Sequence, residues 1–230
     1  MLATGKPVVM LNFSGRPTVM SWESENIPAI LNVWFGGSEA PDAIADVLFG
    51  DVNPSGKLST TMPRNMGQIP IYYNHLMTGR PKSKGHNGFQ KYRSNYLDSP
   101  NSPLYPFGYG LSYTTFEYGE LMLDSTELNT DGTISASIKV KNTGGREGTE
   151  IVQFYIRDMV ASIARPVKEL KHFERISIKP GESKVVTFKI TIDALKFYNS
   201  SLEYVAEPGQ FQVMAGPDSE RLSVKEFILQ

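Results

Sequence analysis

Apolar and polar side chains alternate along most of the second half of the chain, from about residue 119 onward. Period-two alternation predicts strands that bury one face, and it is clear in residues 134–140, 152–156, 186–192 and 211–215. Gly- and Pro-containing turn sequences separate the runs, at residues 142–145, 179–182 and 207–209. The pattern predicts about seven short strands, which is typical of an immunoglobulin-like or fibronectin type III β-sandwich.

The first 66 residues show continuous apolar runs instead of alternation. Residues 8–11 and 29–34 are short runs of this kind, as expected of parallel strands that are buried on both faces. The segment between them is long enough for the crossover that parallel neighbours require. Residues 57–62 predict a third strand, which ends at Pro63 because proline interrupts strand pairing.

One helix is predicted between residues 38 and 50. Ser38 has the chemistry of an N-cap, and Gly50 is suited to a left-handed C-cap. The side chains with helical spacing that would face the sheet are Ala40, Ile44, Val47 and Leu48. Three strands and one helix are too few to cover a parallel sheet on both faces. We therefore expect the missing elements to lie before Met1 or on another chain.

The sequence thus predicts α/β plus all-β architecture in three segments. Residues 1–66 are expected to form the C-terminal part of a flavodoxin-like α/β-sandwich domain, and residues 117–230 a fibronectin type III-like β-sandwich that can fold alone. Residues 67–116 are expected to be a long, mostly irregular connector, since they are rich in Gly, Pro, Asn and Tyr and show no sustained period. Connectors of this length are usually functional or disordered.

The connector holds the candidate substrate-binding residues. Arg80, Lys91 and Arg93 can donate hydrogen bonds to hydroxyl groups, and the ring of Tyr92 can stack on a flat ligand. The alternative is that the aromatic rings of the connector fill the seam between the two flanking domains, where tyrosine buries its ring and keeps its hydroxyl wet. Both interpretations remain open at this stage.

Composition excludes several function classes. A net charge of −1 gives no basic field for nucleic acid, and no apolar run approaches the length of a membrane span. The three histidines have no metal-ligand spacing, and no cysteine is present. No metal or other cofactor is expected. The acidic residues Glu39, Asp42 and Asp46 lie on one face of the predicted helix, where capping and solubility explain them better than catalysis.

Two sequence runs resemble the C-terminal half of family 3 glycoside hydrolases of the β-glucosidase type. The first is Asp46-Val-Leu-Phe-Gly-Asp-Val-Asn-Pro-Ser-Gly-Lys-Leu58, and the second is Pro103-Leu-Tyr-Pro-Phe-Gly-Tyr-Gly-Leu-Ser-Tyr-Thr-Thr-Phe116. Further motifs match in order, among them Arg165-Pro-Val-Lys-Glu-Leu170. The resemblance covers essentially the whole chain. In the connector, the sequence resembles that of the bacterial periplasmic β-glucosidase branch of the family.

The resemblance implies a retaining exo-glycosidase that removes terminal β-linked sugars, with a periplasmic or secreted location. In that family an N-terminal barrel supplies the aspartate nucleophile, and both this residue and the acid/base glutamate would fall before Met1. The resemblance therefore assigns no catalytic residue to this chain, which is expected to be inactive alone. Its partners would be the missing barrel, a β-linked glucoside or oligosaccharide and, as an open option, a second copy of the chain.

Two other functions are considered beside that of an enzyme part. One is a non-catalytic carbohydrate-binding or interaction module centred on the β-sandwich, which the sequence disfavours because the predicted strands have no obvious exposed aromatic row. The other is a scaffold that stabilises the parent protein or its dimer, since unpaired sheet edges in the first segment favour self-association.

Overall fold

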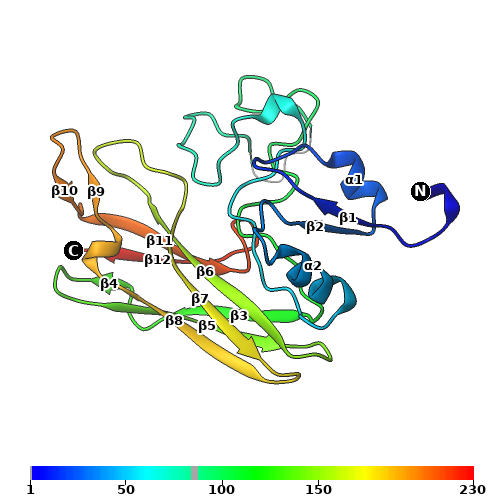
Figure 1. The fold of residues 1–230 in the computed structure, drawn as a ribbon. Coiled ribbons are helices and arrows are strands. Elements are labelled where there is room, and N and C mark those ends of the chain that lie inside the picture. The colour runs from blue at the N-terminus through cyan, green and yellow to red at the C-terminus, as the bar shows by residue number, and fades with distance from the viewer. Residues whose placement is uncertain (1, 84–87) are drawn as a thin grey trace.

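A computed structural model describes residues 2–83 and 88–230 of the protein. Its larger part is a β-sandwich and its smaller part an open α/β layer, with long irregular segments between them (Figure 1). This arrangement confirms the predicted fold class. None of the helices within the described residues has the length and apolar composition of a membrane-spanning helix.

The N-terminal part contains two parallel strands, β1 (Val9–Asn12) and β2 (Ala29–Asn32), paired in register from Val9↔Ala29 to Asn12↔Asn32. A short 3₁₀ turn, η1 (Leu2–Thr4), precedes β1, and the helix α1 (Ser21–Asn26) forms the crossover. Helix α2 (Ala40–Phe49) follows β2. No residue of β1, β2, α1 or α2 is fully buried, so this layer does not enclose a core of its own.

Two details of the N-terminal prediction are wrong. The N-cap of α2 is Glu39 and not Ser38, and no side chain caps the helix there; the Ala40 amide instead donates to the carbonyl of Gly37. Residues 57–62 do not form a strand. Their backbone bonds with residues 104–109, through Leu58–Tyr109, Gly108–Leu58 and Met62–Tyr105 pairs, and therefore does not extend the β1–β2 sheet.

The β-sandwich consists of two sheets. The five-stranded sheet has the order β4-β12-β11-β6-β7 and the three-stranded sheet the order β3-β5-β8. Its longer strands are β3 (Phe116–Leu123), β5 (Ile134–Asn142), β6 (Gly148–Asp158), β7 (Glu169–Ile178), β8 (Ser183–Ile190), β11 (Gly209–Gly216) and β12 (Ser223–Leu229). These seven confirm the strand pattern predicted from the sequence.

Short elements complete the sandwich. Strand β4 (Glu127–Leu128) pairs in parallel with the end of β12. The 3₁₀ turn η3 (Ile192–Ala194) leads into a two-stranded hairpin of β9 (Phe197–Tyr198) and β10 (Tyr204–Val205). A further 3₁₀ turn, η2 (Met66–Gln68), opens the connector.

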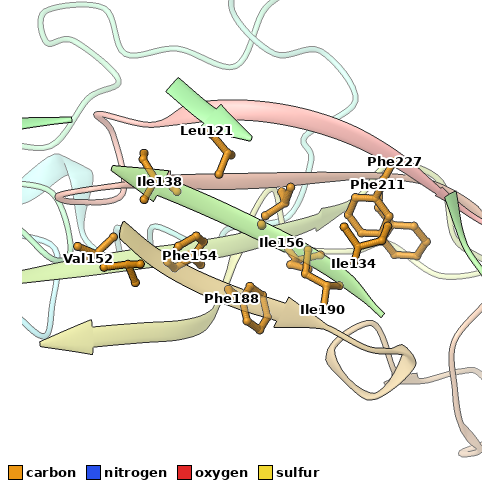
Figure 2. Close-up of a cluster of buried hydrophobic side chains, with 14 of the residues drawn as sticks. Leu121, Ile134, Ile138, Val152, Phe154, Ile156, Phe188, Ile190, Phe211 and Phe227 are labelled. Atoms are coloured by element: carbon orange, nitrogen blue, oxygen red, sulfur yellow. The ribbon is translucent and has the colours of Figure 1, made fainter. Parts of the chain in front are cut away.

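The core lies between the two sheets, where alternate side chains of facing strands meet (Figure 2). It includes Ile138 of β5, Phe154 of β6 and Phe211 of β11, all at most 1% exposed. Strand β6 is buried on its second face as well, because Tyr155 packs edge-on against Tyr73 of the connector. The sandwich therefore has an apolar interior, and the connector covers part of the outer face of β6.

Candidate functional site

The connector lies against both parts of the protein and is held by side-chain amides. Gln68 is buried, accepts from the Arg64 amide through Oε1 at 2.6 Å, and donates through Nε2 to the carbonyls of Pro100 and Ser102. Asn95 closes the tip of the loop by bonding the amide and the carbonyl of Gln90, each at 2.8 Å. These bonds hold irregular backbone in one conformation, which is what a binding loop requires.

The four predicted substrate-binding residues all lie on this loop and are all exposed. The Arg80 carbonyl accepts from the Ser94 amide at 2.8 Å, so Arg80 and Arg93 lie near the same neck of the loop. The Lys91 Nζ atom lies 4.9 Å from the centroid of the Tyr92 ring, and Tyr92 has a left-handed backbone with φ of 63°. The four residues thus lie on one exposed loop.

Other aromatic residues of the connector fill the seam, as the alternative interpretation proposed. Tyr73 stacks on Phe107 with ring centroids 4.3 Å apart, and Tyr105 stacks on Tyr109 at 5.0 Å. The Tyr105 hydroxyl donates to the Ser24 Oγ atom at 2.9 Å, which ties the connector to α1. Burial raises the pKa of Tyr109, and the neighbouring Tyr105 adds to this effect.

An ion pair lies in the seam between the N-terminal part and the sandwich. The Lys57 Nζ atom lies 3.0 Å from Glu150 Oε1, and the two side chains are only 11% and 5% exposed. Nζ also donates to the Gly110 carbonyl at 3.3 Å, and the Tyr118 hydroxyl donates to the same Glu150 oxygen at 2.8 Å. Burial, with the adjacent carboxylate, raises the pKa of Tyr118 well above its usual range, so this phenol remains a donor.

The ion pair borders a hollow of about 550 Å³ whose wall also includes Thr114, Arg221 and Ser223. Sequence reasoning missed it because Lys57 and Glu150 are 93 residues apart and belong to segments that were assigned to different domains. Asn53 also joins the N-terminal part to the connector and the sandwich. Its Oδ1 atom accepts from the Ser112 hydroxyl and the Tyr113 amide, and its Nδ2 atom donates to the Glu147 carbonyl.

The acidic residues of the predicted helix and two of the three histidines lie in the part of the chain that the structure describes. Glu39, Asp42 and Asp46 are exposed on or beside α2, as expected for solubilising charge. His172 packs flat on Phe188 with centroids 5.1 Å apart, His75 is exposed, and His86 lies outside the described residues. No group of three or more metal-ligating residues occurs within residues 2–83 and 88–230.

Asp158 at the end of β6 is a carboxyl that sequence reasoning did not single out. Burial raises its pKa, against the opposing effects of the Val160 amide and the Arg165 guanidinium. Its Oδ1 accepts from the Val160 amide at 3.2 Å, whereas its buried Oδ2 has no hydrogen-bond partner in the described structure. The following loop is closed by Glu207, which accepts from the Ser162 amide and hydroxyl. The geometry gives Asp158 a structural role in shaping this loop.

Comparison with known proteins gives two family matches. The glycosyl hydrolase family 3 C-terminal domain matches residues 1–113, and the fibronectin type III-like domain matches residues 150–219. The periplasmic β-glucosidase of Salmonella typhimurium is 53% identical over 99% of this chain, and a β-xylosidase of Formosa agariphila is 46% identical over 96%. This chain spans about 30% of the length of these curated relatives (29% and 30%).

A solved structure shows the same fold. The β-glucosidase of Listeria innocua in complex with glucose is 47% identical, superposes with a TM-score of 0.92, and covers 99% of this chain, which in turn covers 31% of that enzyme. A mutant of the Listeria enzyme was solved in complex with laminaribiose. The similarity extends over the N-terminal layer, the connector and the sandwich together.

Proposed function

Because the chain belongs to glycoside hydrolase family 3, we propose that it serves as the C-terminal part of a retaining, exo-acting β-glucosidase-like enzyme. The complete enzyme removes terminal β-linked sugars, and this chain supplies the connector and the sandwich around the substrate rather than the two catalytic carboxylates. Retaining hydrolysis needs a nucleophile and an acid/base carboxyl about 5–5.5 Å apart. The observation that carries the proposal is the likeness to β-glucosidases along 99% of the chain.

The proposal divides the chain into residues 1–66, the connector 67–116 and the sandwich 117–230. In this scheme the second sugar of a β-linked substrate is contacted by Arg80, Lys91, Tyr92 and Arg93. Their exposure on one loop, which Gln68 and Asn95 hold in place, supports this assignment. The proposal includes a periplasmic or secreted location, which is supported by the name of the Salmonella relative, a periplasmic β-glucosidase. Its partners are the catalytic barrel and a β-linked glucoside, and a homodimer is a further partner to test.

The test is a fusion protein. The part of the Salmonella β-glucosidase that precedes its match to this chain is joined to the 230-residue chain, and turnover of aryl β-glucoside and aryl β-xyloside is compared with that of the chain alone. We expect the fusion to hydrolyse at least one substrate with retention of configuration and the chain alone to hydrolyse neither. Robust turnover by the chain alone, or a folded fusion without any turnover, would contradict the proposal.

The connector residues are tested in the same fusion. Replacing both Arg80 and Arg93 by alanine is expected to raise KM for laminaribiose by about tenfold, because charge-assisted hydrogen bonds to the second sugar are lost. KM for the aryl glucoside, which has no second sugar, is expected to change little. Arg146→Ala, which removes an exposed arginine from the β5–β6 turn, is the matched control. Equal effects of the connector changes on both substrates would argue against a contact with the second sugar.

A further inference from the structure

The hairpin of β9 and β10 carries a pair of exposed tyrosines at the end of the sandwich that lies away from α1 and α2 (Figure 1). Tyr198 and Tyr204 are directly opposite each other in the antiparallel register, and Phe197 is opposite Val205. Because side chains alternate along a strand, Phe197 points inward and is 4% exposed, whereas Tyr198 and Tyr204 point outward and are 63% and 53% exposed.

The two rings pack against each other. Their centroids are 4.9 Å apart and their planes are inclined by 40°, so their inner faces lie together and each ring keeps its outer face open. An aromatic face attracts the positively polarised C–H groups of a flat saturated ring. The open outer face of each ring can therefore take one pyranose unit.

The hairpin holds this surface rigidly. The Asn199 amide donates to the Glu203 carbonyl, and the Leu202 amide to the Asn199 carbonyl, each at 3.0 Å. The Asn199 Oδ1 atom accepts from the amides of Ser201 and Glu203. Beneath the hairpin, the Arg165 guanidinium lies 4.3 Å from the centroid of the Phe197 ring. A surface that is fixed before binding loses little conformational entropy when a ligand is bound.

Polar groups border the rings. The Asn199 Nδ2 atom donates to Glu203 Oε2 at 3.1 Å; Glu203 is exposed and Asn199 is half-buried. An amide and a carboxylate at the rim can bond to hydroxyl groups, which both donate and accept. The acidic residue at the rim disfavours anionic ligands such as nucleic acid. Two rings also offer much less than the roughly 800 Å² per partner of a stable protein interface.

From this combination we propose that Tyr198 and Tyr204 form a carbohydrate-binding platform, in which the open outer face of each ring stacks on a pyranose ring of a β-linked glucan. The sugar class rests on the proposed function, whereas the platform itself rests on the geometry of the hairpin. The predicted strands have no obvious exposed aromatic row, which disfavours sugar binding by the sandwich when the sequence is considered alone. The platform has no such row in the sequence, because its two rings come from two separate two-residue strands that are joined by a turn.

The test is affinity electrophoresis of the 230-residue chain in gels that contain hydroxyethylcellulose or laminarin, with dextran as the α-linked control. We expect at least one β-glucan, and not dextran, to retard the chain. The double variant Tyr198→Ser/Tyr204→Ser is expected to bind at least about tenfold more weakly, because each ring lost removes a stacking partner. Phe173→Ser is the matched control, since Phe173 is also an exposed aromatic of the sandwich, at 61%.

A second variant separates binding from folding. Tyr198→Trp/Tyr204→Trp keeps the aromatic faces and is expected to retain or increase the retardation, and thermal unfolding of all variants checks that they are folded. Absence of retardation by both β-glucans, or unchanged retardation of a folded serine variant, would overturn the platform. The assay needs no catalysis, so an inactive fusion enzyme would count against the proposed function and leave the platform to this measurement.

Discussion

At the scale of single residues, the buried Lys57–Glu150 pair is the most consequential contact between the two parts of the protein. A charge left without its partner in such a site is strongly unfavourable, because it has lost its hydration and regains nothing. Glu150 is 5% exposed, and its other donor, the Tyr118 hydroxyl, is neutral. The stability of the seam therefore depends on neither charge being left without its partner.

We predict that Lys57→Met lowers the free energy of unfolding by about 3–5 kcal/mol, since it leaves the Glu150 carboxylate buried and unpaired. The double variant Lys57→Met/Glu150→Met should lose less than the single one, because no charge is stranded. Urea unfolding measures both. Lys225→Met, which removes the exposed Lys225–Glu120 pair, is the control and should have little effect. A double variant that is less stable than Lys57→Met would contradict this account.

Asp158 gives a prediction with a defined sign in pH. Burial raises its folded pKa above the ordinary 3.8, so ionisation destabilises the folded chain as pH rises through the window from 3.8 to the folded pKa. Asp158→Asn keeps an oxygen for the Val160 amide and cannot ionise. Its stability relative to the unmodified chain should therefore increase across that window and stay constant above it, as measured by urea unfolding at a series of pH values.

Asp124→Asn is the control with the opposite sign. The Asp124 carboxylate accepts from the Ser135 amide at 2.8 Å, and this bond lowers the Asp124 pKa. Its contribution is present at neutral pH and is lost as pH falls through the folded pKa. The stability of this variant relative to the unmodified chain should therefore decrease as pH rises. Parallel pH profiles for the two variants would refute the assignment of their environments.

At the scale of elements, α2 ends at Gly50, whose backbone is left-handed with φ of 84°. A Cβ atom there would lie 3.6 Å from the Arg146 Nη1 atom, an ordinary contact, so the backbone conformation alone opposes a side chain. We predict that Gly50→Ala destabilises α2 by about 1–2 kcal/mol, measured by hydrogen exchange of the helix amides. Gly145→Ala, at a glycine with open space around its Cβ position, should leave α2 unchanged.

The predictions from sequence succeeded for elements whose burial is periodic. Strand β5 shows the alternation in its sequence and in its burial, because one of its faces meets the core. The predicted third strand failed because residues 57–62 have the composition of a strand but bond to residues 104–109, which only the tertiary fold determines. The predicted connector residues lie on one loop, whereas the Lys57–Glu150 pair and the tyrosine platform depend on contacts between distant segments and had no local signal.

At the scale of the whole molecule, the sandwich and the N-terminal layer differ in the extent of their buried core. Ile134, Val152 and Val213 of the sandwich are completely buried, whereas β1, β2 and α2 contain no fully buried residue. Phe35 and Phe49 in the N-terminal layer are more than 80% exposed. The free energy of local opening follows the number of buried apolar contacts, so the N-terminal layer should open more readily than the sandwich.

We predict that backbone amides of β1 and β2 exchange with deuterium orders of magnitude faster than those of β5, β6 and β11 in the same chain. Hydrogen exchange followed by mass spectrometry measures this contrast. In the fusion enzyme described above, the amides of β1 and β2 should become protected if the added polypeptide covers them. Equal protection of the two parts in the chain alone would show that the N-terminal layer is as stable as the sandwich.

The Lys57–Glu150 pair also bears on how this protein can change over evolutionary time. Replacing one partner alone is expected to cost much stability. Substitutions at position 57 should therefore be accepted only together with a compensating substitution at position 150. Aligned sequences of relatives should therefore show the two columns varying as a unit, although 93 residues separate them. A recombination event with its breakpoint between Lys57 and Glu150 would join residues from two parents, so it should be accepted only where the two residues still form a pair.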